Sequence, residues 1–246
     1  MSEWYRTAFG ELYPLVYPHR GVAEAARVVS RLSPLLHAPG PTLDVACGNG
    51  RYLEALRSAG IDGYGVDLSE YLLGEGARAG LGGRLVCGDM RALPFAAGAF
   101  GSAINMFTSF GYFGDDGDNA RALREMARVV APRGAFVLDF IHAGRIQERF
   151  EPHSERAAGD ARVVERRELT GDGRVLIKRV EVSRPGRETV AYAERLRLYT
   201  HPELARMLAD AGFEVRRTHG DYELGPFDER ASERVIFVCE KRPAGA

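Results

Sequence analysis

Apolar residues along the chain form short runs that alternate with segments of helical spacing. Within residues 21–37 they recur every three or four positions, as on the buried face of a helix, and Pro39, Gly40 and Pro41 end that helix. The same patterns predict strands at 42–46, 64–68, 84–87, 102–107, 135–140, 213–218 and 234–240, and helices at 51–59, after Ser69, at 118–130 and at 202–211. Short apolar strands separated by helices are typical of a parallel sheet covered on both faces. We therefore predict a doubly wound α/β domain.

The pattern changes after about Ile141. Residues 163–169, 175–183 and 189–199 read as three strands joined by glycine-containing turns. This predicts an antiparallel β insert over residues 160–199. Its charges are mixed in sign, which is typical of a solvated sheet face. The insert is expected either to cover an acceptor site or to form a contact in a homodimer.

Composition places the chain among globular proteins. Hydrophobic residues make up 45% and charged residues 27%, and 33 basic residues balance 34 acidic ones to a net charge of −1. That balance gives no overall field to attract nucleic acid or an anionic membrane. Cys47, Cys87 and Cys239 are widely spaced, unlike a disulfide framework or a metal knuckle, and no acidic or histidine cluster indicates a metal. With no signal-like start and no apolar run of membrane length, we expect a cytoplasmic protein.

A glycine-rich loop, DVACGNG, joins the first strand of the sheet to a helix and contains Gly48 and Gly50. Such a turn brings backbone N–H groups and a helix N-terminus to a ligand. Two details argue against a dinucleotide. The third glycine of the dinucleotide fingerprint is replaced by Leu53, and Asp44 would repel phosphates while favouring a cationic ligand.

Three acidic residues stand at the ends of three successive strands: Asp44, Asp67 and Asp89. Each alone is more typical of a turn or a helix cap. Together they meet at the carboxyl edge of the sheet, where ligands of open α/β sheets bind. Asp67 stands where an acidic side chain accepts the two hydroxyls of a ribose, and Asp89 with Met90 could hold an adenine. This predicts an adenosine-like ligand.

These residues carry a resemblance to a known family. The segments LDVACGNG, GVDLS, CGDMRALPF and APRGAFVLDF, over residues 42–140, resemble the motifs of class I S-adenosylmethionine-dependent methyltransferases, and AGFEV followed by ERVIFVCEK is similar to their last two strands. The resemblance implies a Rossmann-like, seven-stranded, mostly parallel sheet with an antiparallel last strand. It divides the chain into an N-terminal helical lid over 1–41, a methyltransferase domain over 42–145 and 200–246, and the insert.

The resemblance also implies a cofactor, S-adenosylmethionine, with S-adenosylhomocysteine as product. Gly48 and Gly50 would line its methionine part, Asp67 its ribose, and Asp89 with Met90 its adenine. Arg20 is expected to bind the cofactor carboxylate as a fork, or else to begin a solvated helix. The whole expected set of cofactor-binding residues is Arg20, Asp44, Ala46, Gly48, Asn49, Gly50, Asp67, Leu68, Asp89, Met90 and Asn105.

The methyl acceptor is expected to be a small molecule. Residues 105–113 are aromatic and polar at once and are similar to the segment of small-molecule methyltransferases where donor and acceptor meet, including enzymes that dimethylate amino sugars. Tyr112 stands there at a position where those enzymes can have histidine. Candidates for a catalytic group are Tyr112, Tyr17 and His142, against the alternatives of core aromatics and a capping histidine.

The expected activity is in-line transfer of a methyl group to N or O of that acceptor. Two alternatives remain at this point. A sensor protein would bind the same cofactor without transfer. An aminopropyltransferase would need an acidic cluster for a polyamine, for which Asp115, Asp116 and Asp118 are a faint candidate.

Overall fold

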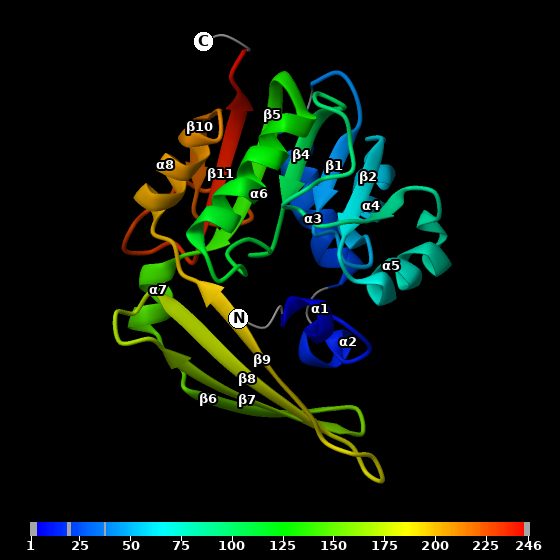
Figure 1. Ribbon diagram of the computed structural model, residues 1–246, viewed down its shortest axis with the longest axis vertical. Helices are drawn as coiled ribbons and strands as arrows, with labels where there is room; N and C mark the ends of the chain where they lie inside the picture. Colours follow the sequence, from blue (N-terminus) through cyan, green and yellow to red (C-terminus); the bar gives the residue numbers. More distant parts are fainter. Residues whose placement is uncertain (1–3, 19–20, 37, 244–246) are drawn as a thin grey trace.

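The computed structural model describes residues 4–18, 21–36 and 38–243 (Figure 1). A seven-stranded sheet has the order β10-β11-β5-β4-β1-β2-β3, in which only β11 runs antiparallel to its neighbours. Its strands are β1 (Thr42–Val45), β2 (Gly63–Asp67), β3 (Leu85–Cys87), β4 (Phe100–Asn105), β5 (Val130–Ile141), β10 (Phe213–His219) and β11 (Arg234–Lys241). The predicted α/β class, the seven strands and the antiparallel last strand are confirmed.

Helices cover both faces of this sheet, because apolar side chains of successive strand residues point to opposite sides. Ile236 packs with α3 (Val22–Leu32) and α4 (Arg51–Ser58), whereas Val235 and Phe237 pack with α6 (Asp116–Val129) and α8 (His201–Asp210). The remaining helical segments of the domain are η1 (Ser33–Leu35), α5 (Glu70–Gly76), the π-helical turn η2 (Ala77–Leu81) and α7 (Ala143–Glu148).

Two short helices, α1 (Tyr5–Ala8) and α2 (Tyr13–Val16), precede α3 and lie below the main sheet in Figure 1, close to the second sheet. Val16, with Leu12 and Leu15, packs on Val163, Val180 and Val182 of that second sheet. The N-terminal segment therefore connects the insert with the main domain, while α3 belongs to the helical layer of the main domain.

The insert is a four-stranded antiparallel sheet of order β6-β7-β8-β9, where the sequence predicted three strands. Its strands are β6 (His153–Ala158), β7 (Ala161–Leu169), β8 (Val175–Ser183) and β9 (Val190–Arg197). The extra strand, HSERAA, has no alternation of apolar and polar residues. Its positions alternate between half-buried and exposed, so none of them requires an apolar side chain. The turn at Gly159, which has φ 64°, is the local signal for that hairpin.

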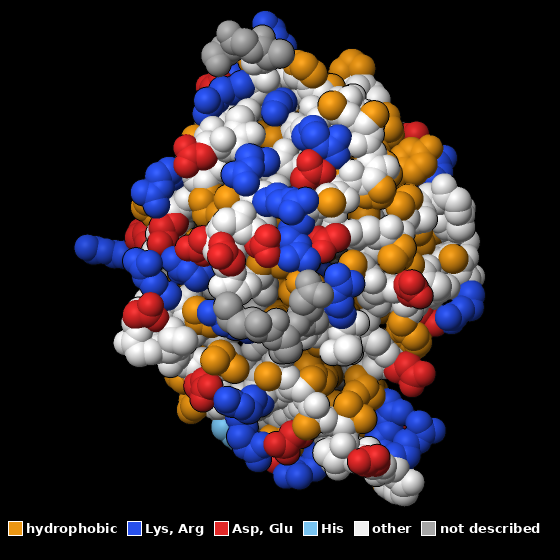
Figure 2. All heavy atoms as spheres, in the orientation of Figure 1, with side chains coloured by type: hydrophobic (Ala, Val, Ile, Leu, Met, Phe, Trp, Pro, Cys, Tyr) orange, Lys and Arg blue, Asp and Glu red, His pale blue; other side chains and the backbone are white. Residues whose placement is uncertain are grey.

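Basic and acidic side chains are interspersed over the face seen in Figure 2, with no broad field of one sign. No helix in the described part of the chain is both long and apolar enough to cross a bilayer.

Candidate active site

The glycine-rich loop leaves β1 in a left-handed conformation. Ala46, Gly48 and Gly50 have φ values of 59°, 57° and 80°. The Gly48 N–H donates to Asp67 Oδ2 at 2.7 Å, so the loop is fixed to the end of β2. Gly50 forms the N-cap of α4 and donates its N–H to the Cys47 carbonyl. The glycine-rich loop is therefore a tight turn at the carboxyl edge of the sheet.

Asp67 is held by two backbone groups. Its Oδ2 accepts the Gly48 N–H, and its Oδ1 accepts the Ser69 N–H at 2.8 Å. Burial raises the pKa of this carboxyl group, although these N–H groups oppose the shift. Because each carboxylate oxygen has two lone pairs, both oxygens can still accept a hydrogen bond from a ligand hydroxyl group.

Asp44 is 1% exposed in the middle of β1, beside Asp67 and Arg51. Burial, and then the charge of Asp67, raises its pKa to about 8 against the opposing effect of Arg51. Its Oδ2 atom is buried and has no hydrogen-bond partner among the residues that the structure describes. A buried, unpartnered carboxylate oxygen facing a cavity is suited to a cationic or hydrogen-bond-donating ligand.

Asp89 follows β3 and is paired with Arg91. Its carboxylate accepts the Arg91 backbone N–H at 2.8 Å and the Nη2 group at 2.7 Å, and Arg91 continues to Asp118 at 2.9 Å. The net effect is a lowered pKa for Asp89, because the contacts with Arg91 outweigh burial. Arg91 therefore orients Asp89 and shares the carboxylate that the sequence assigned to an adenine.

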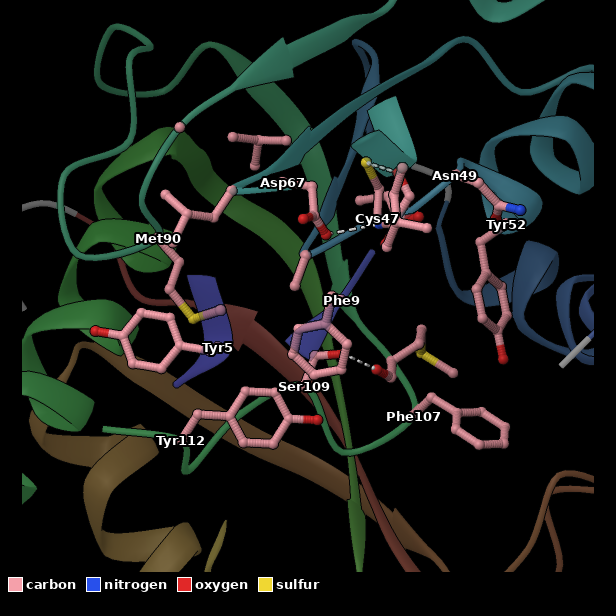
Figure 3. Close-up of a pocket in the computed structure, with 18 of the residues that line it drawn as sticks. Tyr5, Phe9, Cys47, Asn49, Tyr52, Asp67, Met90, Phe107, Ser109 and Tyr112 are labelled. Atoms are coloured by element: carbon pink, nitrogen blue, oxygen red, sulfur yellow. Dashed lines mark hydrogen bonds between the residues drawn. The ribbon is translucent and has the colours of Figure 1, made fainter. Parts of the chain in front are cut away.

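Aromatic side chains of the N-terminal segment and of residues 107–113 line the cavity together with the acidic residues (Figure 3). Tyr112 contacts Trp4 at 5.0 Å and Phe9 at 5.8 Å between ring centroids. Phe9 continues to Tyr13 at 5.9 Å, and Tyr5 meets Phe113 at 5.4 Å. The rings of Tyr5, Phe9, Tyr13, Tyr112 and Phe113 line the cavity, and aromatic π faces attract cations.

The structure brings most of the predicted site residues into this first cavity. Those that line it are Asp44, Ala46, Gly48, Asn49, Asp67, Leu68, Asp89, Met90 and Tyr112. Gly50 and Asn105 do not line it; the Asn105 amide is buried and donates to the Val45 carbonyl at 2.9 Å. Arg20 lies outside the described residues.

A second cavity lies between the main domain and the insert. Tyr17, Lys178 and Glu194 line it together with Arg234. The Tyr17 hydroxyl donates to the Glu194 carboxylate at 2.6–2.7 Å, and Lys178 Nζ pairs with Glu194 at 2.8 Å and donates to Tyr17 Oη. Its lining includes six basic and three acidic residues: Arg149, Arg156, Arg167, Lys178, Arg195 and Arg234 against Glu151, Glu165 and Glu194.

Phe107 and Tyr112 line both cavities, so the two cavities meet at these rings. His142 lines neither of them. It is 2% exposed, its Nδ1 lies 3.0 Å from the Ser232 carbonyl and its Nε2 lies 3.3 Å from Glu229. The geometry gives His142 contacts within the fold and leaves Tyr112 and Tyr17 as the catalytic candidates that face a cavity.

Several residues of the site were missed from the sequence. Arg51 lines the first cavity, pairs with Glu24 and lies over the Phe107 ring at 4.7 Å. Phe9 lines it as well. The position of Arg51 directly after Gly50 was an available signal, whereas nothing in the local pattern pointed to Phe9. No group of three or more His, Cys, Asp or Glu side chains within residues 4–18, 21–36 and 38–243 is placed to bind a metal ion.

A doubly wound sheet with acids at its carboxyl edge and a glycine-rich turn defines a Rossmann-like protein that binds an adenosine-like ligand. Residues 43–138 match the family model described as a methyltransferase domain. This segment is a methyltransferase domain of the S-adenosylmethionine-dependent type, and a solved S-adenosylmethionine-bound methyltransferase that is similar to the chain agrees with this.

Three proteins illustrate the similarity. The chain is 30% identical over 139 residues to a dTDP-3-amino-3,4,6-trideoxy-alpha-D-glucopyranose N,N-dimethyltransferase from Streptomyces venezuelae, a match that covers 55% of this chain and 58% of that protein. An S-adenosylmethionine-bound amino pentose methyltransferase from Micromonospora echinaspora is 26% identical with a TM-score of 0.68, over 94% of this chain and 97% of that one. A methyltransferase structure from Clostridium acetobutylicum shares the fold, with a TM-score of 0.80 at 16% identity over 94% and 96% of the two chains.

The first cavity fits S-adenosylmethionine, the cofactor of this family. The unpartnered oxygen of Asp44 suits the cationic methionine part, and the spare lone pairs of Asp67 suit the ribose hydroxyls. Met90 lines the cavity next to Asp89, at the position that the resemblance assigns to the adenine.

Proposed function

We propose that this chain transfers a methyl group from S-adenosylmethionine to an amine nitrogen of a small, polar acceptor of the amino sugar kind. The observation that carries the proposal is the meeting of the two cavities at Phe107 and Tyr112. A donor in the first cavity and an acceptor in the second would meet beside these two side chains, inside the protein and away from bulk water.

The lining of the second cavity supports a polar acceptor. Tyr17, Lys178 and Glu194 form a linked set of donors and acceptors on its wall, which suits hydroxyl and amino groups. The excess of basic over acidic side chains suits an acceptor that also carries an anionic group. Both features agree with the dTDP-linked amino sugar named for the relative from Streptomyces venezuelae.

S-adenosylmethionine supplies an activated methyl group on a sulfonium centre. The protein needs to orient the acceptor lone pair in line with that group and to exclude water. Tyr112 can accept or donate a hydrogen bond at the junction, and Tyr17 can do so from the second cavity, where Glu194 takes the phenolic hydrogen bond. An amine exposes its nucleophilic lone pair once its ammonium form has lost one proton to a base. A hydroxyl group is far less acidic and needs a stronger base, so an amine suits this arrangement better.

The acidic residues proposed for a polyamine have other contacts. Asp115 caps α6 by accepting the Gly117 N–H, Asp116 accepts the Tyr199 hydroxyl at 2.5 Å, and Asp118 pairs with Arg91. Aminopropyl transfer to a polyamine is therefore disfavoured. A sensor protein would have no use for a second cavity that shares the Phe107 and Tyr112 rings with the first.

Incubation of the purified chain with methyl-labelled S-adenosylmethionine and matched acceptors tests the proposal. The acceptors are dTDP-linked sugars that differ only in an amino or a hydroxyl group at one carbon, together with the free amino sugar. We expect one or two labelled methyl groups on the amino compound and none on its hydroxyl analogue. Methylation of the hydroxyl analogue alone, or binding of S-adenosylhomocysteine without transfer to any acceptor, would contradict the proposal.

A further inference from the structure

Two consecutive residues at the junction of the cavities have left-handed backbone conformations. Phe107 has φ 61° and Thr108 has φ 60°. Neither is glycine, and threonine is β-branched, so both are strained there. Such strain persists only where the surroundings enforce it, and it is concentrated at functional sites. The groups that enforce this corner, residues 107–108, therefore bear on function.

Asp139 binds both backbone N–H groups of the corner. It lies in β5 and is 0% exposed. Its Oδ2 accepts the Phe107 N–H at 2.7 Å, and its carbonyl oxygen accepts the Thr108 N–H at 3.1 Å. One buried residue thus fixes the direction of both peptide groups.

Arg234, the first residue of β11, completes the arrangement. Its Nε donates to Asp139 Oδ1, and its Nη2 donates to Thr108 Oγ1 at 2.9 Å. Burial is the largest single influence and lowers the pKa of this guanidinium, but the charge and hydrogen bond of Asp139, together with Tyr222 and Tyr52, outweigh it, so the net effect is a raised pKa. Tyr222 donates its hydroxyl to Asp139 Oδ2 at 2.7 Å and stacks on Phe107 at 6.2 Å.

The corner forms the wall between the two cavities. Phe107 lines both of them, Arg51 lies over its ring from the first cavity, and Thr108 and Arg234 line the second. A return of either residue to an ordinary conformation would move the Phe107 ring at the point where donor and acceptor would meet.

We propose that Asp139 and Arg234 are positioning residues, which lock the 107–108 corner so that acceptor and methyl group are aligned in line. This inference rests on the proposed function. Neither side chain lines the first cavity, so the effect falls on turnover and not on cofactor affinity. A shift of about 1 Å in such a wall can reduce a rate by about 100-fold.

Asp139→Asn tests the proposal, because it keeps the size of the side chain and removes the charge that Arg234 needs. We expect turnover on the methylated amine to fall at least tenfold while the affinity for S-adenosylhomocysteine, measured by calorimetry, changes less than threefold. Hydrogen exchange of a peptide covering the 107–108 corner, measured with S-adenosylhomocysteine bound, is expected to become at least tenfold faster.

Glu125→Gln is the matched control. Glu125 also binds an arginine and a backbone N–H, through Arg128 at 2.7 Å and Leu93 at 2.8 Å, but it lines neither cavity. The Glu125→Gln variant should be less stable to heat than the native chain, with the same turnover and the same hydrogen-exchange rate at the 107–108 corner. Equal effects of the two variants, measured at the same margin below each unfolding temperature, would overturn the proposal.

Two further variants keep the test decisive if Asp139→Asn unfolds. Arg234→Lys retains a charge but cannot bridge Asp139 and Thr108 as a fork, so it should lower turnover in the same way. Thr108→Gly removes the strain at one position, and adding it to Asp139→Asn or to Arg234→Lys should restore at least part of the turnover. Absence of any rescue, with both single variants slow, would also overturn the proposal.

The exchange measurement separates this inference from the proposed function. If no amine is methylated but Asp139→Asn still loosens the corner, the proposed acceptor is wrong and the locking role is retained. If the corner keeps its exchange rate in Asp139→Asn, the locking role is wrong, whatever the acceptor.

Discussion

Cofactor affinity is predicted to depend on pH through Asp44, and Asp44→Asn is predicted to remove that dependence. The pKa of the buried carboxyl group is raised to about 8, chiefly by burial. In the protein without cofactor it is therefore about 1% ionised at pH 6 and about 50% ionised at pH 8. The α-ammonium group, which S-adenosylmethionine and S-adenosylhomocysteine share, prefers the ionised form of Asp44, so binding must remove the proton from Asp44 at low pH.

The magnitude follows from this linkage. Below pH 8 the affinity for S-adenosylhomocysteine should rise by up to about tenfold per pH unit, equal to about 1.4 kcal/mol, and it should level off above pH 8. The Asn variant is neutral throughout. It should bind about as well as the native chain at pH 6 and at least about tenfold more weakly at pH 8.5.

Calorimetric titration with S-adenosylhomocysteine from pH 6 to 8.5 measures both curves, and titration of the ligand amine cancels in their difference. Repeating the titration in buffers of different ionisation enthalpy counts the protons released. Parallel curves for the two proteins, or no proton release at pH 6.5, would refute the reasoning.

The same shift predicts an opposite effect on folding. Between pH 4 and 8 the folded chain holds a proton on Asp44 that the unfolded chain has lost, so this group makes the free energy of unfolding fall as pH rises, by up to about 1.4 kcal/mol per unit. The Asn variant without ligand should therefore melt at a higher temperature than the native chain at pH 8. Thermal unfolding followed by circular dichroism measures this difference.

Three further predictions concern single side chains. Asp67→Ala leaves the Gly48 and Ser69 N–H groups without their acceptor and should weaken S-adenosylhomocysteine binding more than about tenfold, or 1.4 kcal/mol, by calorimetry; unchanged affinity would remove the ribose assignment. Tyr112→Phe should slow methyl transfer and keep cofactor affinity within about threefold, because the ring contacts remain and only the hydroxyl is lost; normal turnover in a radiolabel assay would exclude a catalytic hydroxyl. His142→Asn should lower thermal stability by about 1–3 kcal/mol, since its buried contacts are lost, and leave turnover unchanged; a slowed reaction in the folded variant would place His142 in the mechanism.

The fold was predictable because its strands are short and apolar and its turns contain glycine or proline. The apolar run around Leu43 and the helix α4, which ends at Ser58 shortly before Gly60, follow the local rules without conflict. The strand β6 was missed because HSERAA has no apolar alternation, and it becomes a strand through its pairing with β7 across the turn at Gly159.

The cofactor residues could be predicted because they lie in or directly after the last residues of strands. Asp44, Gly48 and Asp67 each occupy a position that the topology itself brings to one edge. The 107–108 corner could not be predicted, since its conformation depends on Asp139 and Arg234, which are distant in sequence and meet it only in the folded sheet.

The insert leaves the main sheet after β5 and α7 and returns at α8, so both crossings lie at the carboxyl edge where the cavities meet. Its strands pair only with one another. Side chains on the inner face of the insert can therefore be exchanged, and its outer turns lengthened, without altering any strand pairing in the seven-stranded sheet that carries the first cavity. If the insert binds the acceptor as we propose, evolution of acceptor preference is in this way decoupled from retention of the methyl donor.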